Sequence, residues 1–287
     1  ALGLTAAYRL AQLGLPTTVI EHETVLGGLA AGFPVGGTHL DRFYHHLFGT
    51  DRTAIALLRE LGLGKDLLWL RPKTGVLYRG RRYQLDSPLA VLRFTPLSAV
   101  DRLRLGVVVA YLKALPDHRS LEHYTADEWL RRAMGRSAYE VVWRPQLEAK
   151  FGARYPDISM AWMWARIHDR TTSLGYLRGG FQALYDRLGA EIRRLGGEIR
   201  LGETVTGLVE LPDGAVGVRT TRGQERFDRV LSTLPTRVTI RLAADLPPDF
   251  LRQYDWGDAY GAHCAILALD RQLLADGIYW LSVTDPG

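Results

Sequence analysis

The alternation of apolar and polar residues near the start of the chain predicts a helix followed directly by a buried strand. Apolar side chains recur at helical spacing over residues 2–13, and Gly14 stands where such a helix would end. Residues 17–21 form a β-branched run typical of a strand in a parallel sheet, and this run ends in Glu21. Because a helix and a parallel strand make the second half of a β-α-β unit, we expect the unit's first strand to precede Ala1.

The pattern of the remaining chain alternates between helical and β-rich stretches. Residues 51–63 have the periodicity of an amphipathic helix, and residues 76–85 alternate around Gly80 as in a β-hairpin. Residues 88–164 are helical in character, with breaks expected at Pro96, Pro116, Gly135, Pro145 and Pro156. After residue 175 we expect a helix over 181–195 and strands over 198–201, 205–211, 216–221, 226–231, 262–269 and 278–283.

Composition and charge exclude several classes of protein. With 287 residues, 47% of them hydrophobic and 23% charged, the chain is long enough for about two globular domains. Its single cysteine, Cys264, can form neither an internal disulfide nor a cysteine metal site, which favours a cytoplasmic location. The net charge of +5 suits a phosphate-bearing ligand or peripheral contact with an anionic membrane, and no nucleic-acid-binding motif accompanies it. No apolar run approaches the ~20 residues that a membrane-spanning helix needs.

Glycines and one acid near the start carry the clearest chemical signal. In dinucleotide-binding β-α-β units, the last glycine of G-x-G-x-x-G lies in the first helical turn, and an acid ~20 residues later binds ribose hydroxyls. Gly3 and Glu21 stand in that register, and Gly27 and Gly28 follow at once. A glycine doublet there lets the backbone approach a phosphate or a ribose closely. The alternative is an ordinary helix–strand pair that ends in a surface acid and a flexible turn.

Residues 1–10, 19–21 and 26–28 together resemble the N-terminus of the flavin-containing amine oxidase superfamily. That group includes protoporphyrinogen oxidases, carotenoid desaturases and, more distantly, UDP-galactopyranose mutases. The resemblance implies an α/β fold in which a Rossmann-like FAD-binding domain carries an inserted helical and β substrate domain. It also implies that Gly3 and the first helix bind the FAD pyrophosphate, that Glu21 holds the adenosine ribose, and that the glycine doublet lies against the cofactor.

The resemblance extends into the second half of the chain. Residues 177–181 resemble the glycine pair where the chain re-enters the FAD domain. The segment around Val205 and residues 230–235 resemble two strands of that domain, which implies an adenine contact at Val205 and a cofactor-side loop at Leu234 and Pro235. An ordinary β-meander is the alternative. The implied boundaries are 1–75 and 175–240 for the FAD-binding domain, 76–174 for the mainly helical substrate domain, and 241–287 for the start of an incomplete substrate-domain sheet.

The segment 41–48 supplies the candidate catalytic residues. In the family this segment descends toward the flavin ring, so the resemblance implies a hydrogen bond from Tyr44, His45 or His46 to a flavin carbonyl or to the substrate. Histidine suits proton transfer near neutral pH. Because neighbouring side chains on a strand point in opposite directions, we expect at most one of the two histidine rings to face the cofactor. Histidines that only pack a loop are the alternative, and no third ligand at a persuasive spacing indicates a metal site.

The sequence also departs from the family. Leu29 stands where an arginine is common, and no lysine matches the one that many amine oxidases place beside the flavin, since Lys150 lies in a different context. Simple amine oxidation is therefore not the expected reaction. We expect an FAD-dependent oxidoreductase that removes a hydride equivalent from an organic, apolar small molecule. The alternatives are a flavin-dependent sugar-nucleotide mutase without net redox change and a non-catalytic flavin-fold protein.

The two ends of the sequence suggest a piece of a longer protein. The chain opens at Ala1 without an initiator methionine or a basic leader, and it stops at Gly287 without a closing element. We therefore expect this piece, expressed alone, to bind FAD poorly or to fold incompletely. The sequence predicts neither the substrate, the electron acceptor nor the oligomeric state.

Overall fold

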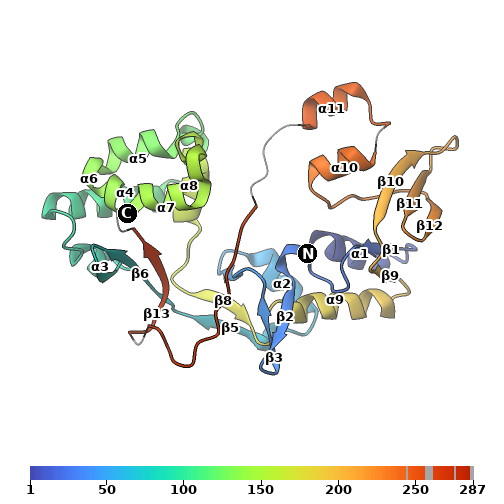
Figure 1. Cartoon of the computed structure of the whole chain (residues 1–287), viewed down its shortest axis with the longest axis horizontal. Coiled ribbons are helices and arrows are strands. Elements are labelled where there is room, and N and C mark those ends of the chain that lie inside the picture. Colours follow the sequence, from blue (N-terminus) through green and yellow to red (C-terminus); the bar gives the residue numbers. More distant parts are fainter. Residues whose placement is uncertain (244, 256–260, 275, 285–287) are drawn as a thin grey trace. The chain divides into compact units, whose positions relative to one another are not determined.

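The chain divides into two compact units in the computed structural model. The structure describes residues 1–243, 245–255, 261–274 and 276–284. Unit 1 comprises residues 1–46, 53–68 and 176–264, and unit 2 comprises residues 47–52, 69–175 and 265–287. Each unit is thus assembled from segments far apart in the sequence (Figure 1). The FAD-binding and substrate domains that the sequence predicts are defined by what they bind, so their assignment stays a prediction.

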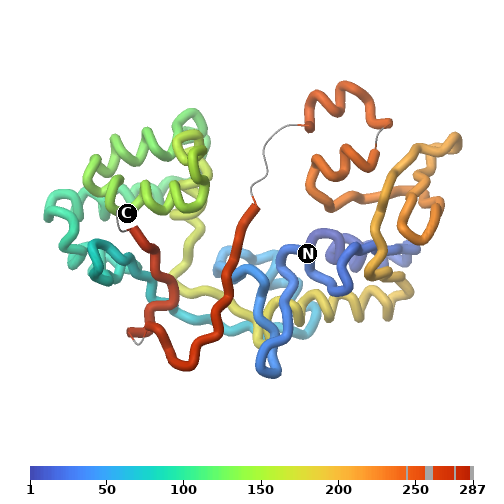
Figure 2. Tube along the Cα trace, viewed as in Figure 1, coloured from blue at the N-terminus to red at the C-terminus, as the bar shows by residue number. Residues whose placement is uncertain are grey.

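Two parallel strands and two helices form the centre of unit 1. Strand β1 (Thr18–Glu21) pairs with β9 (Glu198–Leu201). Helix α1 (Leu2–Gln12) packs against α9 (Gln182–Arg194), and the blue start of the chain runs beside the yellow α9 in Figure 2. Helix α1 forms because its inward positions recur at helical spacing. These buried positions are Leu4, Ala7, Tyr8 and Ala11.

Unit 1 also contains short sheets and helices around this centre. Strands β10, β11 and β12 form an antiparallel sheet, and β2 and β3 form a hairpin. Helix α10 lies against β10. The bounds are β2 Gly32–Val35, β3 Thr38–Asp41, α2 Arg52–Glu60, β10 Val205–Glu210, β11 Val216–Thr220, β12 Gly223–Phe227, α10 Thr236–Leu242 and α11 Pro248–Tyr254.

The strand expected over residues 226–231 is wrong beyond Phe227. Residues 228–235 have no regular structure, and Val230 and Leu231 are 40% and 64% exposed. A β-branched, apolar run becomes a strand only where a neighbouring strand accepts and donates its backbone hydrogen bonds. Within the described chain no strand pairs with these residues.

Unit 2 is built mainly of helices around one apolar core. Its largest fully buried side chains include Tyr139, Leu130 and Met160. Ser98 and Thr125 cap two of the helices by accepting hydrogen bonds from the amides of Asp101 and Glu128. The helices are α3 Pro88–Leu92, α4 Ala99–Ala114, α5 Ala126–Met134, α6 Arg136–Ala138, α7 Arg144–Phe151 and α8 Met160–His168.

One of the predicted helix breaks in unit 2 is wrong. Pro145 does not interrupt a helix but lies in the first turn of α7. The π-helical turn Tyr139–Trp143 runs directly into α7, so the helical backbone continues from Arg136 to Phe151 past this proline.

A three-stranded sheet completes unit 2. The hairpin expected around Gly80 is confirmed: β6 (Lys73–Tyr78) pairs with β7 (Arg81–Gln84) through a turn in which Arg79 and Gly80 have φ of 49° and 69°. Strand β13 (Ile278–Val283) pairs in parallel with β6.

Three further strands lie where the sequence passes between the units. Strands β5 (Leu67–Leu70) and β8 (Leu174–Leu177) each include residues of both units, and β4 (Leu47–Phe48) pairs with the start of β8. The strand expected over residues 262–269 is wrong, because those residues have no regular structure. No helix in the described part of the chain has the length and apolar character needed to cross a membrane.

Candidate functional site

The carboxyl end of β1 lies close to the start of α1. Helix α1 packs against β1, and the short connection over residues 13–17 makes the two run in opposite directions, so the end of β1 at Glu21 lies near the start of the helix. One oxygen of that carboxylate, Oε1, accepts a hydrogen bond of 2.9 Å from the amide of Glu23. No side chain caps the first amides of α1. These amides and the helix dipole make this end suited to an anion.

Gly3 allows a loop to approach the first turn of α1. A Cβ atom at Gly3 would lie 3.1 Å from Oγ1 of Thr233, which is tighter than most real contacts. Leu234 and Pro235 follow Thr233 directly, and Pro235 is the residue before α10. The structure therefore brings Gly3, Glu21 and the segment before Leu234 to the same end of the parallel strand pair.

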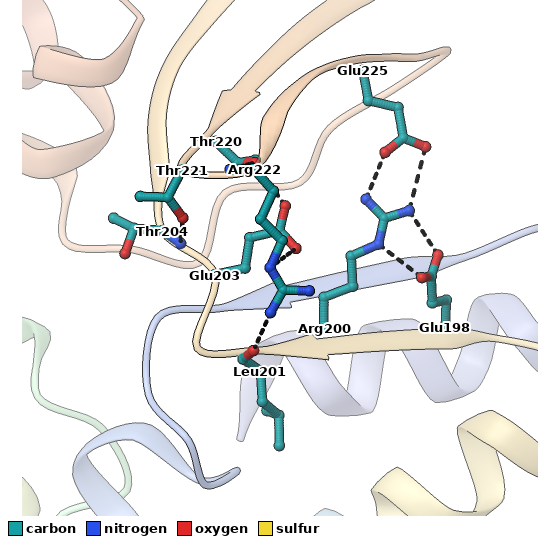
Figure 3. A network of polar contacts seen from close by, with 9 residues as sticks. All are labelled: Glu198, Arg200, Leu201, Glu203, Thr204, Thr220, Thr221, Arg222 and Glu225. Atoms are coloured by element: carbon teal, nitrogen blue, oxygen red, sulfur yellow. Dashed lines mark hydrogen bonds and ion pairs between the residues drawn. The ribbon is translucent and has the colours of Figure 1, made fainter.

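Glu203, whose side chain is buried, connects β1 to the strand that begins at Val205. The amide of Glu203 donates a 3.0 Å hydrogen bond to the carbonyl oxygen of Glu21. The Glu203 side chain is only 3% exposed; it accepts a 2.7 Å hydrogen bond from the Thr220 hydroxyl, and Nε of Arg222 lies 3.6 Å away (Figure 3). Val205 starts β10 two residues later and is half-buried. Glu203 thus fixes the position of Val205 relative to Glu21.

The same network continues along β9. Arg222 donates a 3.2 Å hydrogen bond to the carbonyl oxygen of Leu201, and Arg200 pairs with the carboxylates of Glu198 and Glu225 (Figure 3). Sequence reasoning missed Glu203 and Arg222. The sequence shows only an acid shortly before β10 and an arginine in the turn after β11, and the two cannot be matched without knowing how β10 pairs with β11.

The two glycines of the doublet have different surroundings. Gly27 has φ of 126°, and a Cβ there would lie 2.8 Å from Cδ2 of Tyr185 and 2.9 Å from Cα of Ala31. Packing therefore requires glycine at this position. Gly28 has φ of 60°, and a Cβ there would meet no atom within 4 Å. Of the two, Gly28 presents its backbone to open space.

The second glycine pair packs against the end of β3. A Cβ at Gly180 would lie 2.9 Å from the carbonyl oxygen of His39, and the next amide, that of Phe181, donates a 3.2 Å hydrogen bond to Oδ1 of Asp41. Burial raises the pKa of Asp41, while this amide and the charge of His45 act in the opposite direction. The pair at Gly180 thus holds the segment that leads to the candidate catalytic residues.

Tyr44, His45 and His46 lie in an irregular segment rather than a strand. Nδ1 of His45 is 2.7 Å from the carbonyl oxygen of Phe43, so Nδ1 donates a hydrogen bond to that oxygen and Nε2 is the nitrogen left for a ligand. The ring of His46 is tilted against Tyr176, with 6.3 Å between centroids, and Tyr44 is 52% exposed. The two histidines have different neighbours, and their catalytic role stays a prediction.

A cavity of about 350 Å³ lies beyond the carboxyl ends of β1 and β9. Thr24, which follows β1, and Leu201, the last residue of β9, contribute to its wall. Helix α9 adds the polar side chains of Gln182, Asp186 and Arg193. In open α/β sheets, ligands bind outside the carboxyl ends of the strands. The residues that line this cavity do not include Gly3, Glu21 or Gly28, so it is distinct from the end of β1 where those residues meet.

Comparison with known proteins identifies similar sequences and folds. The profile of the family described as flavin containing amine oxidoreductase matches residues 3–283. Among curated proteins, no sequence matches the chain significantly.

Three solved structures illustrate the likeness in fold. A candidate protoporphyrinogen oxidase from Exiguobacterium sp. 255-15 is 21% identical with a TM-score of 0.65, over 88% of this chain and 61% of that one. An oxidoreductase from Methanosarcina mazei is 20% identical with a TM-score of 0.66, over 89% and 62%. A putrescine oxidase bound to putrescine is 18% identical with a TM-score of 0.63, over 88% and 60%. The chain thus spans about three-fifths of the length of each of these proteins.

Proposed function

The chain belongs to the flavin containing amine oxidoreductase family, and from that membership we propose that the whole protein is an FAD-dependent oxidoreductase. Its substrate is a small organic molecule that loses a hydride and a proton and gains a double bond. The two electrons pass on to an acceptor such as dioxygen or a quinone. When bound, FAD accepts the hydride, and the protein supplies position, electrostatics and exclusion of water.

The observation that carries this proposal is the meeting of three segments at one end of β1. The start of α1, the end of β1 at Glu21 and the loop at Thr233 all lie there. The residues fit the cofactor: Oε2 of Glu21 is available for a ribose hydroxyl, the first amides of α1 can bind a phosphate, and Gly28 lets the backbone approach closely.

The chain's own residues then orient the reactants and move a proton. Glu203 holds the start of β10, so that the backbone of Val205 is positioned for the adenine. His45, whose Nδ1 proton is directed to the Phe43 carbonyl, accepts the substrate's proton at Nε2. The exposed, free thiol of Cys264 is consistent with a reducing compartment, and we place the protein in the cytoplasm.

The proposal predicts that Glu21→Ala weakens FAD binding. Loss of a buried ribose partner costs about 1–3 kcal/mol. The measurement is titration of the apoprotein of the whole protein with FAD, followed by the flavin absorbance at about 450 nm. Glu210→Ala removes an exposed carboxylate from β10 of the same unit and should leave FAD affinity unchanged.

Two results would contradict the proposed function. A whole protein that takes up no FAD would not be a flavoenzyme. Activity that appears only after chemical reduction, and that consumes no electrons, would indicate a mutase or an isomerase instead. The expected result is loss of flavin colour when substrate is added without oxygen, and its return when oxygen or a quinone is admitted.

A further inference from the structure

Helix α4 of unit 2 is apolar on its outer side as well as on its inner side. The inner positions Leu105 and Leu112 are buried, and the helix packs on its inner side against α5, α6 and α8. The outer side of a surface helix normally carries charged and polar residues. On α4 that side is formed by exposed apolar residues instead. We call them the apolar face, and they are Val100, Leu103, Val107, Ala110, Tyr111 and Ala114.

The apolar face is a continuous strip and not a set of scattered side chains. Val100, Leu103, Val107 and Tyr111 follow one another at intervals of three and four residues, which places them on one side of the helix. Each of these four residues is between 50% and 74% exposed. Single exposed apolar residues are normal on a protein, whereas a contiguous apolar strip marks a surface that another body covers.

Positively charged side chains border the apolar face. At ~100° of rotation per residue, Arg104 lies beside one edge of the strip, and Arg102 and Lys113 lie towards the other. Arg104 donates a 2.7 Å hydrogen bond to the carbonyl oxygen of Ala133, and Lys113 donates one of 3.0 Å to the carbonyl oxygen of His168. These neutral acceptors hold the side chains in place without cancelling their charge.

The acid of α4 does not offset these cations at the strip. Asp101 lies in the first turn of the helix, and its carboxylate accepts a 2.8 Å hydrogen bond from the hydroxyl of Ser98 at the helix cap. The α4 sequence thus combines three cations with one acid, and that acid is engaged at the cap.

An aromatic pair lies at one edge of the apolar face. The ring of Tyr111 is stacked on that of Trp129 from α5, with 6.4 Å between centroids and 16° between the ring planes. Tyrosine and tryptophan combine an apolar ring with a polar group, and both are enriched at the boundary between membrane and water.

The charges and the length of α4 favour one occupant of this face over another. Two copies of the chain that met through it would bring their cations together, and such like-charge contacts are unfavourable. An anionic lipid surface attracts the same cations, and its acyl chains accept the apolar strip. With 16 residues, α4 is shorter than the ~20 that a spanning helix needs, so the helix suits a position along the membrane surface.

We propose that the apolar face of α4 docks the protein on the surface of a membrane that contains anionic phospholipid. Leu103 and Val107 enter the boundary between headgroups and acyl chains, and Arg104 and Lys113 face the phosphate groups. The net charge of +5 adds a general attraction to such a surface. Docking involves only residues of unit 2 and does not depend on FAD, so it goes beyond the proposed function.

Co-sedimentation of the whole protein with lipid vesicles tests the proposal. Vesicles of phosphatidylglycerol and phosphatidylcholine in equal parts are compared with vesicles of phosphatidylcholine alone, at about 0.15 M salt. We expect binding to the mixed vesicles to be at least about tenfold tighter, because two or more cations at an anionic surface together contribute that factor. Absent binding, or equal binding to both kinds of vesicle, would overturn the inference.

Matched variants locate the contact on α4. The double variant Leu103→Gln with Val107→Gln keeps good helix formers and should weaken vesicle binding by at least about tenfold, since burial of either apolar side chain contributes that factor. Leu13→Gln removes a similarly exposed leucine at the end of α1 and should bind as the parent does. Unfolding in urea shows whether the variants are folded, and Val100→Gln replaces a double variant that is not. Unchanged binding in folded variants of the apolar face would contradict the proposal.

The same proteins distinguish the other two occupants. If the face joins two copies, the parent sediments as a dimer without lipid and the double variant sediments as a monomer. If another part of the whole protein covers the face, the double variant unfolds at a lower urea concentration than the parent. Either result, together with a parent that does not bind anionic vesicles, would replace the membrane as the occupant.

Discussion

At the scale of single residues, neighbouring positions of the same type can have unlike roles. Gly27 and Gly28 are adjacent and both have positive φ, but only Gly27 is closed in, by Tyr185 and Ala31. Gly28 has open space where a side chain would be. One glycine is therefore required by packing and the other is available to a ligand.

This difference predicts opposite outcomes for two alanine variants. Gly27→Ala should lower the stability of the chain by more than about 1–3 kcal/mol, because a Cβ meets backbone and a ring as well as an unfavourable φ. Gly28→Ala bears only the cost of the φ value, about 1 kcal/mol, yet should weaken FAD binding in the whole protein. Urea unfolding and FAD titration measure the two effects. Equal stability loss in both variants would contradict the packing role of Gly27.

Some residues of the candidate site can be predicted from the sequence, and others cannot. Gly3 and Glu21 could be found because the helix and strand between them fix a spacing that one ligand requires. Glu203 could not, because its partners Thr220 and Arg222 reach it only through the register of β10 on β11. A spacing along one chain is visible in a sequence; a contact across strands is not.

At the scale of elements, local signals predicted most helices and strands well. The apolar periodicity of α1, the β-branched run of β1 and the glycine turn between β6 and β7 are all confirmed. Residues 228–231 failed because their composition indicates a strand while the strand itself depends on a neighbour. The residue types of a segment determine its strand propensity, and contacts with a neighbouring strand decide whether a strand forms.

The cap of α5 gives a prediction at this scale. The Thr125 hydroxyl accepts a 3.2 Å hydrogen bond from the Glu128 amide, and the Thr125 backbone bridges to Ser159 ahead of α8. Thr125→Ala should therefore lower the free energy of unfolding by about 1 kcal/mol. Thr95→Ala, at an exposed loop position of the same unit, is the control. Equal urea midpoints for Thr125→Ala and the parent chain would show that the cap does not contribute.

At the scale of the whole molecule, charge links the stability of unit 1 to pH. Glu60 on α2 accepts hydrogen bonds from Arg9, Tyr8 and Gln12 of α1. The Arg9 guanidinium is the main cause that lowers the pKa of Glu60 from 4.5 to about 2. A carboxyl whose pKa is lower in the folded state stabilises that state above its unfolded pKa, and this stabilisation is lost as the pH falls.

Glu60→Gln should therefore lower the free energy of unfolding at pH 7. This difference from the parent chain should shrink as the pH falls from 4.5 to about 2, where the Glu60 carboxyl becomes protonated in the folded state too. Unfolding in urea across this pH range measures the difference between the variant and the parent chain. Glu210→Gln, on the exposed side of β10, should follow the parent at every pH. A pH-independent difference for Glu60→Gln would mean that its neutral hydrogen bonds, and not its charge, connect α1 to α2.

The pairing of β1 with β9 also sets an order of events during synthesis. Thr18 leaves the ribosome early, and its partner Glu198 follows only after the whole helical part of unit 2 has been made. The contacts within that helical part are local and can form at once, whereas β1 must wait with its edge unprotected. The nascent chain therefore carries the Val19-Ile20 segment without its β9 partner until residues 198–201 have been made, and unpaired strand edges at such a stage are prone to aggregate.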